Sequence, residues 1–144
     1  MKLRVKRTHP KAKIPAYAHP TDACVDLTCV SVEKTDTPGY GYLEYDTGLQ
    51  IEIPAGFIGL IFPRSSISNT GLILANAVGV VDESYRGNIK ARFKAIPHTN
   101  VYGVGDRCCQ FMVIPKVSLE FEEFTGDWEE TERNEDGFGS SGQK

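Results

Sequence analysis

Short apolar segments separated by turn residues run along most of the chain. Residues 89–96 read Ile-Lys-Ala-Arg-Phe-Lys-Ala-Ile, which is the two-residue period of a strand with one solvated face. Residues 51–62 form β-rich segments interrupted by Pro-Ala-Gly at residues 54–56, and residues 111–114 are a fully apolar run that ends at Pro115. Because many short strands follow one another at close spacing, the pattern predicts an all-β fold, either a barrel or a jelly-roll-like sandwich.

Two segments depart from the β pattern. Residues 63–73 begin with helix-capping residues and reach Gly71 about one short helix later, which predicts a short helix there. After Trp128 the sequence becomes acidic and polar, then rich in glycine and serine, and such a segment buries too little apolar surface to order itself alone. We therefore predict one β-barrel domain over residues 1–128 and a mobile C-terminal arm over residues 129–144.

Length and composition are those of one soluble domain. A chain of 144 residues, 40% apolar and 24% charged, suits a single hydrophobic core. No stretch approaches the ~20 apolar residues of a membrane helix, and no apolar run follows the basic residues at the N-terminus, so we expect neither a membrane span nor a secretory signal. The expected location is the cytoplasm, with the nucleus or a host cytoplasm as alternatives for a eukaryotic or viral source.

Charge and cysteine spacing argue against two further classes. The net charge of −3 disfavours direct nucleic-acid binding by the whole molecule, and the basic residues of 1–13 and the acidic residues of 120–136 are interpreted as solvated faces. Adjacent residues of a strand point to opposite faces, which is what we expect of the pair at 108 and 109. None of the spacings is that of a zinc site, and we expect reduced, structural thiols at Cys24, Cys29, Cys108 and Cys109.

Two stretches carry candidate chemistry. At residues 63–66, Pro-Arg-Ser-Ser, a strand runs into a helix start, which gathers backbone N–H groups, two hydroxyls and the guanidinium of Arg64 into a possible anion site; the alternative is a plain helix cap. In residues 76–87, Gly79 would allow the backbone to approach a flat ligand closely. Asp82 follows two β-branched residues at a strand end, where partial burial would suit a general base; the alternative is an ordinary hairpin with a turn aspartate.

Two later stretches are open to functional and structural interpretations alike. Arg107 and Gln110 lie where a turn enters an apolar strand, so Arg107 can pair with a neighbouring acid and Gln110 can be an outward strand residue. Arg133 precedes the glycine-rich residues 137–142, in which Phe138 offers a single stacking plate. This ribbon lacks the lysine of a P-loop and the strand–helix context of a dinucleotide fold, and a disordered tail is the alternative.

Taken together, these stretches and residues 22–27 occur in the order of the five motifs of the trimeric dUTPase family, which the chain resembles over roughly residues 18–142. The resemblance implies a distorted jelly-roll-like β-barrel that forms a homotrimer. It also implies an enzyme that hydrolyses dUTP to dUMP and diphosphate with Mg²⁺ as cofactor. The closest matches are at residues 63–66, 79–87, 105–107 with Gln110, and 137–142.

The resemblance assigns the nucleoside end of the substrate to the middle of the chain. Asp82 would orient and deprotonate the water that attacks the α-phosphorus. Tyr85 would pack against the deoxyribose and leave no space for a ribose 2′-hydroxyl. Asn76 and the hairpin backbone at Gly79 and Val80 would read the edge of the uracil.

The resemblance assigns the phosphate end to the flanking motifs. Asp26 would hold Mg²⁺ through water while the phosphates supply the direct ligands, in keeping with the preference of magnesium for substrate phosphates and retained waters. In this family the site lies between subunits, and a third chain supplies the arm. The phosphate chain would be bound by Arg64, Ser65, Ser66 and Gln110. From the arm, Arg133 would meet the γ-phosphate and Phe138 would stack over the uracil, with Gly139 and Ser140 as further substrate-binding residues.

The sequence departs from the family pattern in two motifs. The family usually has glycine where Cys24 stands. Its last motif usually reads Arg-Gly-x-Gly-Gly-Phe, whereas residues 133–138 read Arg-Asn-Glu-Asp-Gly-Phe. The backbone of the first motif and the closure of the arm are therefore where the family geometry carries over least directly.

Three other functions are alternatives to dUTP hydrolysis. A dCTP deaminase shares the fold but places a glutamate ten residues after the aspartate of the third motif, and this chain has Arg92 there. A regulatory, partner-binding protein on the same scaffold is compatible with the same motifs. A coat or lectin-like jelly roll would explain the strands but not five motifs in order.

Overall fold

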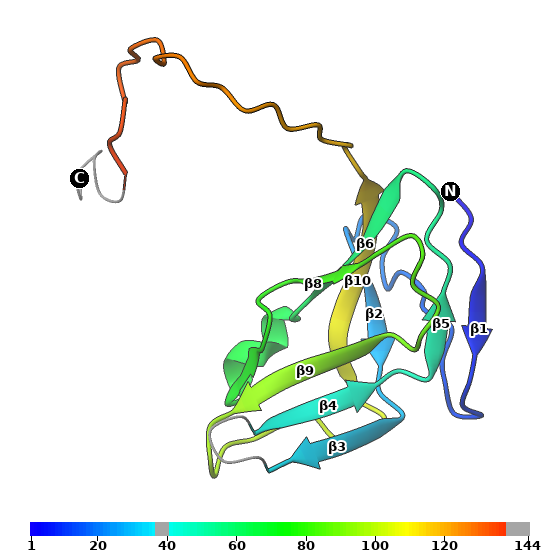
Figure 1. Cartoon of the computed structure of the whole chain (residues 1–144). Helices are drawn as coiled ribbons and strands as arrows, with labels where there is room; N and C mark the ends of the chain where they lie inside the picture. The colour runs from blue at the N-terminus through cyan, green and yellow to red at the C-terminus, as the bar shows by residue number, and fades with distance from the viewer. Residues whose placement is uncertain (37–40, 138–144) are drawn as a thin grey trace.

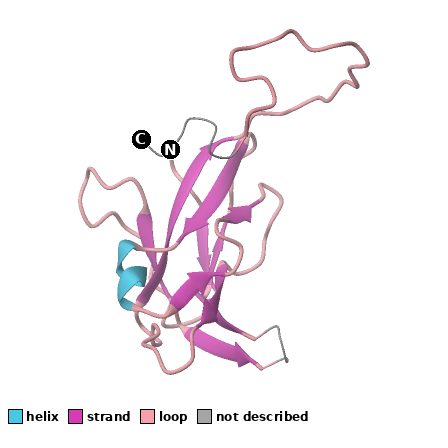
Figure 2. Cartoon of the chain, turned by 90° about the vertical axis from the view of Figure 1, so that its left-hand side faces the viewer, coloured by secondary structure: helices cyan, strands magenta, loops and turns pink. Residues whose placement is uncertain are grey.

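The computed structural model describes residues 1–36 and 41–137 (Figures 1 and 2). Within these ranges the chain forms ten strands and one 3-10 helix, and the fold is the all-β arrangement that the hydrophobic pattern predicts. The elements in order are β1 (Val5–Arg7), β2 (Val25–Thr28), β3 (Ser31–Thr35), β4 (Tyr42–Asp46), β5 (Leu49–Ile51), β6 (Phe57–Phe62), η1 (Ser65–Asn69), β7 (Leu72–Leu74), β8 (Gly79–Val81), β9 (Lys90–Ala95) and β10 (Arg107–Pro115).

The strands form three antiparallel sheets. One four-stranded sheet has the order β2-β10-β6-β8 and another has the order β3-β4-β9-β7, while β1 and β5 pair separately. In Figure 1 the β3–β4–β9 strands lie across the lower end of the β2–β10–β6 strands. Because strands distant in sequence are neighbours in the β2-β10-β6-β8 sheet, the topology brings the first four motifs onto or beside one sheet.

The core is built from alternating strand residues. In β9 the side chains of Ala91 and Phe93 are buried while those of Lys90, Arg92 and Lys94 are exposed, which confirms the predicted strand with one solvated face. At the centre of the core, three aromatic rings contact one another edge to face, and edge-to-face pairs are a favourable aromatic geometry. These rings belong to Tyr45, Phe93 and Tyr102.

A β-bulge at the start of β10 changes the expected placement of two cysteines. The pairing of β10 with β2 shifts register between Arg107 and Cys109, so the alternation of side chains is broken there. Cys108 and Cys109 are both fully buried, with their Sγ atoms 3.9 Å apart, so the prediction that they point to opposite faces is wrong. A hydrogen bond to Cys109 and burial raise the pKa of Cys108, which keeps it a neutral thiol.

The predicted short helix is present as the 3-10 helix η1. Its N-cap, Arg64, has an extended backbone and makes no capping bond from its side chain to the described backbone, so the expected side-chain cap is wrong. At the other end, the N–H of Thr70 donates to the Ile67 carbonyl. The N–H groups of Ser65 and Ser66 have no hydrogen-bond acceptor among the described residues, as the first turn of a helix dictates.

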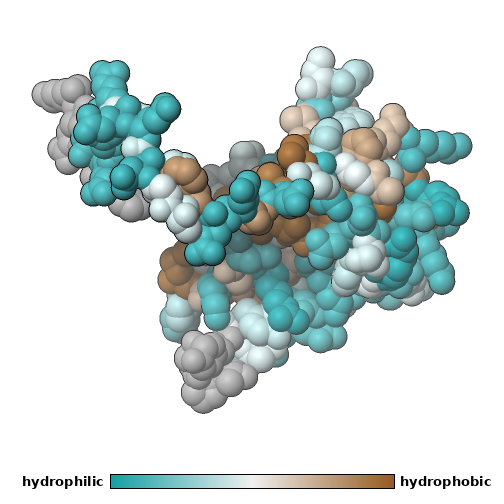
Figure 3. Space-filling model, turned by 45° about the horizontal axis from the view of Figure 1, so that its top comes forward, coloured by the Kyte–Doolittle hydropathy of each residue, from teal (hydrophilic) through white to brown (hydrophobic). Residues whose placement is uncertain are grey.

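After β10, the described part of the C-terminal segment is extended and forms no helix or β-strand. Residues 115–137 are all exposed, and Figure 1 shows them running away from the barrel. Figure 3 shows the mostly hydrophilic segment projecting beside apolar atoms of the barrel surface. The last strand ends at Pro115, before the boundary predicted at residue 128, which stays a prediction. The described part of the structure contains no helix with the length and apolar character needed to span a bilayer.

Candidate active site

The first hollow of functional interest gathers three of the predicted motifs. Strand β10 lies between β2 and β6, and its Gln110 pairs with Asp26 on one side and with Phe62 on the other. Arg64 lies two residues after the end of β6, so the central strand brings the first, second and fourth motifs to one corner. The hollow at this corner, called the phosphate hollow below, has a volume of about 420 Å³ and is lined by Ala18, Asp22, Ala23, Cys24, Asp26, Arg64, Ser65, Arg107 and Gln110.

Two arginines converge on one carboxylate in the phosphate hollow. Arg64 donates from Nε to Asp26 Oδ1 at 2.7 Å and from Nη2 to Oδ2 at 3.1 Å, which is a bidentate pair. Arg107 donates from Nη1 to the same Oδ2 at 2.9 Å, which confirms its predicted pairing with a neighbouring acid. The side chains of Arg64 and Asp26 are about four-fifths buried, at 21% and 23% exposure, so this pair is fixed by its surroundings.

The remaining donors of the phosphate hollow face solvent. Arg107 is 55% exposed and, among the described residues, makes a side-chain hydrogen bond only through Nη1. The N–H groups at the start of η1 add uncompensated donors beside Arg64. Guanidinium and backbone N–H donors around one hollow can bind the oxygens of a phosphate chain.

Two predicted phosphate ligands are placed differently from the others. The half-buried side chain of Gln110 lines the hollow but donates from Nε2 to the Pro63 carbonyl at 2.8 Å, which ties β10 to the end of β6. Ser66 does not line the hollow; its Oγ accepts a hydrogen bond from Arg64 Nη1 at 3.0 Å. Both residues therefore hold the corner in shape, and direct contact with phosphate stays a prediction for them.

A second hollow, called the hairpin hollow below, lies beside β8. It has a volume of about 190 Å³ and shares five residues with an adjoining hollow of about 420 Å³. The structure thus brings together the described residues predicted for the nucleoside end, which are Asn76, Gly79, Val80, Asp82 and Tyr85. The smaller hollow is lined by Ile61, Asn76, Gly79, Val80, Val81, Asp82, Tyr85, Asn88 and Lys90.

The hairpin hollow owes its shape to close packing of β8 against β6. A Cβ atom on Gly79 would lie 3.0 Å from Cβ of Ile61, so glycine allows the two strands to approach each other. Ala77 has a positive φ of 58°, and its N–H donates to the Leu74 carbonyl at 3.1 Å, which turns the chain from β7 into β8. Gly79 therefore has a packing role in addition to its predicted approach to a ligand.

Asp82 is exposed, which contradicts the partial burial expected from the sequence. It follows the buried Val81, but β8 is an edge strand of three residues, and beyond it the chain turns out into solvent. Its backbone carbonyl accepts the N–H of Tyr85 at 3.1 Å, while its carboxylate makes no hydrogen bond to a described residue. Nothing within the described chain covers this carboxylate, so it faces the hollow and the solvent together.

Tyr85 is held against the turn that follows Asp82. Its hydroxyl donates to the Asn88 carbonyl at 3.0 Å. A Cβ atom on Gly87 would lie 2.4 Å from its Oη, so only glycine leaves room for the ring. The side chain remains 43% exposed and therefore offers a surface to a ligand.

The two hollows share no lining residue, so one chain does not bring the predicted phosphate and nucleoside residues together. Arg133 lines neither hollow. It lies in the extended segment, where its Nε donates to the Asp136 carbonyl at 2.9 Å. The predicted Phe138, Gly139 and Ser140 lie outside the described residues.

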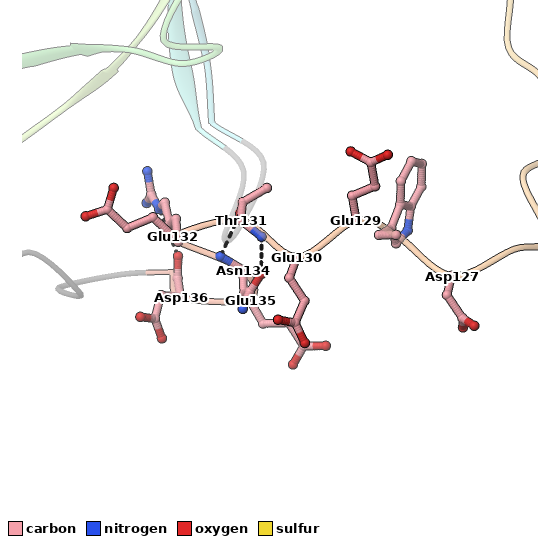
Figure 4. Close-up of a pocket in the computed structure, with 10 residues that line it drawn as sticks. Asp127, Glu129, Glu130, Thr131, Glu132, Asn134, Glu135 and Asp136 are labelled. Carbon is pink, nitrogen blue, oxygen red and sulfur yellow. Dashed lines mark hydrogen bonds between the residues drawn. The ribbon is translucent and has the colours of Figure 1, made fainter.

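A further hollow of about 840 Å³ is formed by residues 127–136 alone (Figure 4). Every residue that lines it is exposed, and Figure 4 shows its carboxylates pointing in different directions. Within residues 1–36 and 41–137, no three His, Cys, Asp or Glu side chains gather closely enough to hold a metal ion. Because this hollow is a bend in an exposed segment, it remains open to water and is not a candidate active site.

Several lining residues were not singled out from the sequence. Asn88 donates from Nδ2 to both carboxylate oxygens of Asp46, at 3.0 and 3.1 Å, and Lys90 donates to Glu44 at 2.6 Å. Hydrogen bonding from Lys90, opposed by burial, holds the pKa of Glu44 below its usual value. The alternation of residues 89–96 indicates that the side chain of Lys90 points outward. Its partner Glu44 could not be identified from the sequence, because that requires knowing that β4 pairs with β9.

Arg92, at the position of the deaminase glutamate, is also engaged by Glu44. Its Nε donates to Glu44 Oε2 at 2.6 Å, and its guanidinium lies 4.6 Å from the centre of the Tyr42 ring. An ion-paired arginine cannot act as the carboxylate that deamination requires. The geometry therefore disfavours the deaminase alternative.

Comparison with known proteins decides the family. The sequence profile described as dUTPase matches residues 10–142. The chain belongs to the dUTPase family. The deoxyuridine 5'-triphosphate nucleotidohydrolase of Escherichia phage T5 is 36% identical over 157 residues, which cover 99% of either chain.

Solved structures of dUTPases have the same fold. The dUTPase of Staphylococcus bacteriophage 80alpha, solved with dUPNHPP, has a TM-score of 0.76 at 25% identity and covers 98% of each chain. The dUTPase of phage phi11 of S. aureus, solved to show the coordination of a structural Mg(II) ion, has a TM-score of 0.70 at 21% identity and covers 88% of this chain and 98% of its own. These matches confirm the jelly-roll-like fold and the dUTP-hydrolysing enzyme class that the motifs predict.

Proposed function

We propose that this dUTPase converts dUTP to dUMP and diphosphate by attack of a water molecule on the α-phosphorus, with Asp82 as the base. The observation that carries the proposal is that Asp82, Asn76, Gly79 and Tyr85 line one hollow. An exposed carboxylate that accepts no hydrogen bond from the described residues is available to accept a proton from water. Cleavage of the α,β-phosphoanhydride bond by an aligned water, with diphosphate as the leaving group, requires no covalent nucleophile.

The nucleoside end of the substrate fits the hairpin hollow. The backbone around Gly79 and Val80 would pair with the uracil edge, and Asn76 would add a side-chain amide to the same edge. Tyr85 would stack on the deoxyribose, because its ring is fixed by the Asn88 carbonyl and by the lack of a side chain at Gly87. A ring fixed in this way excludes a ribose 2′-hydroxyl by steric contact.

The phosphate end fits the phosphate hollow. Arg107 and the backbone N–H groups of Ser65 and Ser66 have N–H donors that are not used by the described residues. The hydrogen bonds of Arg64 with Asp26 fix the orientation of its guanidinium. Donors that are fixed before the substrate arrives stabilise developing charge without reorganisation. A chain with a net charge of −3 can still bind dUTP if Arg64, Arg107, the N–H groups and Mg²⁺ contact the phosphate oxygens at this corner.

The carboxylates of the phosphate hollow suit a magnesium ion that is bound mainly by substrate. Asp26 and Asp22 are too few for a protein cage, and both oxygens of Asp26 already accept guanidinium hydrogen bonds, so Asp26 would contact the ion through water. Bound Mg²⁺ would neutralise charge on the phosphate chain.

Separation of the two hollows supports a shared site. We propose a homotrimer in which the phosphate hollow of one chain meets the hairpin hollow of the next, with Arg133 and Phe138 of a third chain closing over the nucleotide. Exposed apolar side chains on the extended segment support burial of that segment against another chain. These are Val117, Leu119, Phe121, Phe124 and Trp128.

Substrate selectivity tests the proposed function. The purified chain with Mg²⁺ is expected to release diphosphate from dUTP at least 100-fold faster than from dTTP, dCTP or UTP, because the hairpin and Tyr85 reject altered bases and ribose (about 1–3 kcal/mol per excluded group). Comparable rates on all four nucleotides, or ammonia release from dCTP, would overturn the assignment.

A further inference from the structure

Tyr102 lies outside the residues assigned above, yet its side chain ends at the phosphate corner. It belongs to the loop between β9 and β10, and it is 9% exposed. Its Oη lies 3.0 Å from Ser66 Oγ, which in turn accepts a hydrogen bond from Arg64 Nη1 at 3.0 Å. A continuous path of hydrogen bonds therefore joins a buried phenol to a guanidinium that lines the phosphate hollow.

The core holds Tyr102 in place. The Tyr45 hydroxyl donates to the Tyr102 carbonyl at 3.0 Å, and the rings of Tyr45 and Phe93 contact the Tyr102 ring edge to face. Burial raises the pKa of Tyr45 to about 12, so this hydroxyl remains a donor at neutral pH. A side chain that is packed and hydrogen-bonded in this way keeps its orientation when a ligand binds nearby.

The direction of the Tyr102–Ser66 hydrogen bond decides what Ser66 can do. If Tyr102 donates, Ser66 Oγ accepts from Tyr102 and from Arg64, and its own proton is available for a phosphate oxygen. If Ser66 donates to Tyr102, that proton is used inside the chain. An anionic phosphate oxygen is a stronger acceptor than a phenol, so a bound phosphate chain favours donation by Tyr102.

We propose that Tyr102 is a positioning residue for the phosphate chain of dUTP, acting through Ser66 on the orientation of Arg64. The proposal rests on the proposed function, because both assign Arg64 to the phosphate chain. It gives Ser66 a bracing role that accounts for its position behind Arg64 and outside the lining of the hollow.

A double-mutant cycle tests the proposal. Tyr102→Phe keeps the ring and removes the hydroxyl, and it is expected to raise KM for dUTP about 3–10-fold, the range for one lost hydrogen bond, with kcat within about 2-fold of wild type. In a Ser66→Ala background the same change is expected to have no further effect on KM, because the path is already interrupted. Thr99→Val, which removes a hydroxyl bonded only to the Ile96 carbonyl in the same loop, is the matched control and is expected to leave KM unchanged.

Two results would overturn the proposal: an unchanged KM in Tyr102→Phe, or the same fold-change in the wild-type and Ser66→Ala backgrounds. Calorimetric affinity for an α,β-imido analogue of dUTP gives a readout that is independent of turnover. If the wild type fails to bind the analogue, the proposed function fails. If the wild type binds it and Tyr102→Phe binds it equally well, only the role of Tyr102 fails.

Discussion

The phosphate hollow and the hairpin hollow lie on one sheet but differ in how they are held. At the phosphate hollow, Arg64 and Asp26 are mostly buried, and three hydrogen bonds join Asp26 to two arginines. At the hairpin hollow, the carboxylate of the proposed base, Asp82, is exposed just after a three-residue edge strand. The side chains of the phosphate hollow are therefore held in place by contacts within the same chain, whereas the carboxylate of the hairpin hollow has no such contact among the described residues.

This difference has a consequence for catalysis. A general base in bulk solvent aligns a water poorly, because neither the carboxylate nor the water is oriented by a second surface. The phosphate hollow supplies oriented donors, but its two carboxylates, Asp26 and Asp22, already accept hydrogen bonds from Arg64, Arg107 and the His19 N–H. Each hollow therefore provides what the other lacks, which is what a site assembled from two chains requires.

The largest effect is expected from removing the proposed base, Asp82, of the hairpin hollow. Asp82→Asn keeps the size of the side chain and abolishes proton acceptance, so kcat for dUTP is expected to fall about 10²–10⁴-fold with binding retained. Glu83→Gln in the same turn is the control, because Glu83 bonds the Gly56 N–H and Lys116 and lines neither hollow. Steady-state rates and analogue affinity measure both; a modest loss in Asp82→Asn would mean that another group is the base.

A smaller effect is expected from disturbing the hairpin without touching its carboxylate. In Gly87→Ala the new methyl group would collide with the Tyr85 ring and displace it. Because Tyr85 is proposed to pack on the sugar, kcat/KM for dUTP is expected to fall about 10–100-fold. Gly103→Ala meets only Asp106 Oδ2 at 3.6 Å and is the neutral control. Equal kcat/KM in both variants would show that the fixed ring has no part in binding.

At the phosphate hollow, replacing each arginine with lysine tests which of the two contributes more to phosphate binding. Lysine cannot make the bidentate contact of Arg64 with Asp26, so Arg64→Lys is expected to raise KM for dUTP about 10-fold. Arg107→Lys alters a group with a single contact to Asp26 and is expected to raise KM about 2–3-fold. A reversed order of the two effects would show that Arg107, and not Arg64, is the main phosphate ligand.

The smallest effect concerns the ion pairs beside the hairpin hollow. Hydrogen bonds from Lys90 and Arg92 lower the pKa of Glu44 in the folded chain. A lowered folded-state pKa gives stability that is present above the unfolded value, near 4.5, and is lost as the pH falls through the folded value. Glu44→Gln is therefore expected to lower Tm by about 2–4 °C at pH 7 and to remove part of the fall in Tm below pH 4.5, as measured by calorimetry. Asp36→Asn, at an exposed pair with Lys34, should change neither, and an unaltered Tm profile in Glu44→Gln would contradict the coupling.

Features set by local pattern could be predicted from the sequence. The alternation of residues 89–96 identifies β9, and the Pro-Arg-Ser-Ser stretch predicts the helix that begins at Ser65. The residues of the hairpin hollow lie close together in the chain, so their grouping followed from one motif. For these features, periodicity and turn chemistry are sufficient information.

Features set by pairing between distant strands could not be predicted in this way. The bulge that brings the Cys108 and Cys109 sulfurs together depends on the register of β10 against β2. The exposure of Asp82 follows from the edge position of β8, which a single sequence does not reveal. The bond from Tyr102 to Ser66 joins residues 36 positions apart, and no periodicity connects them.

Complementation between two inactive variants tests the shared site most directly. Arg64→Ala and Asp82→Asn chains, which carry different affinity tags, are mixed one to one and co-refolded so that they assemble into random trimers. Each site is proposed to take Arg64 from one chain and Asp82 from the next. One site in three of every mixed trimer then carries both groups, so the mixture is expected to recover about a quarter of the wild-type dUTP turnover. Turnover that stays at the level of the separate variants, in mixtures shown by the tags to contain both chains, would contradict the account.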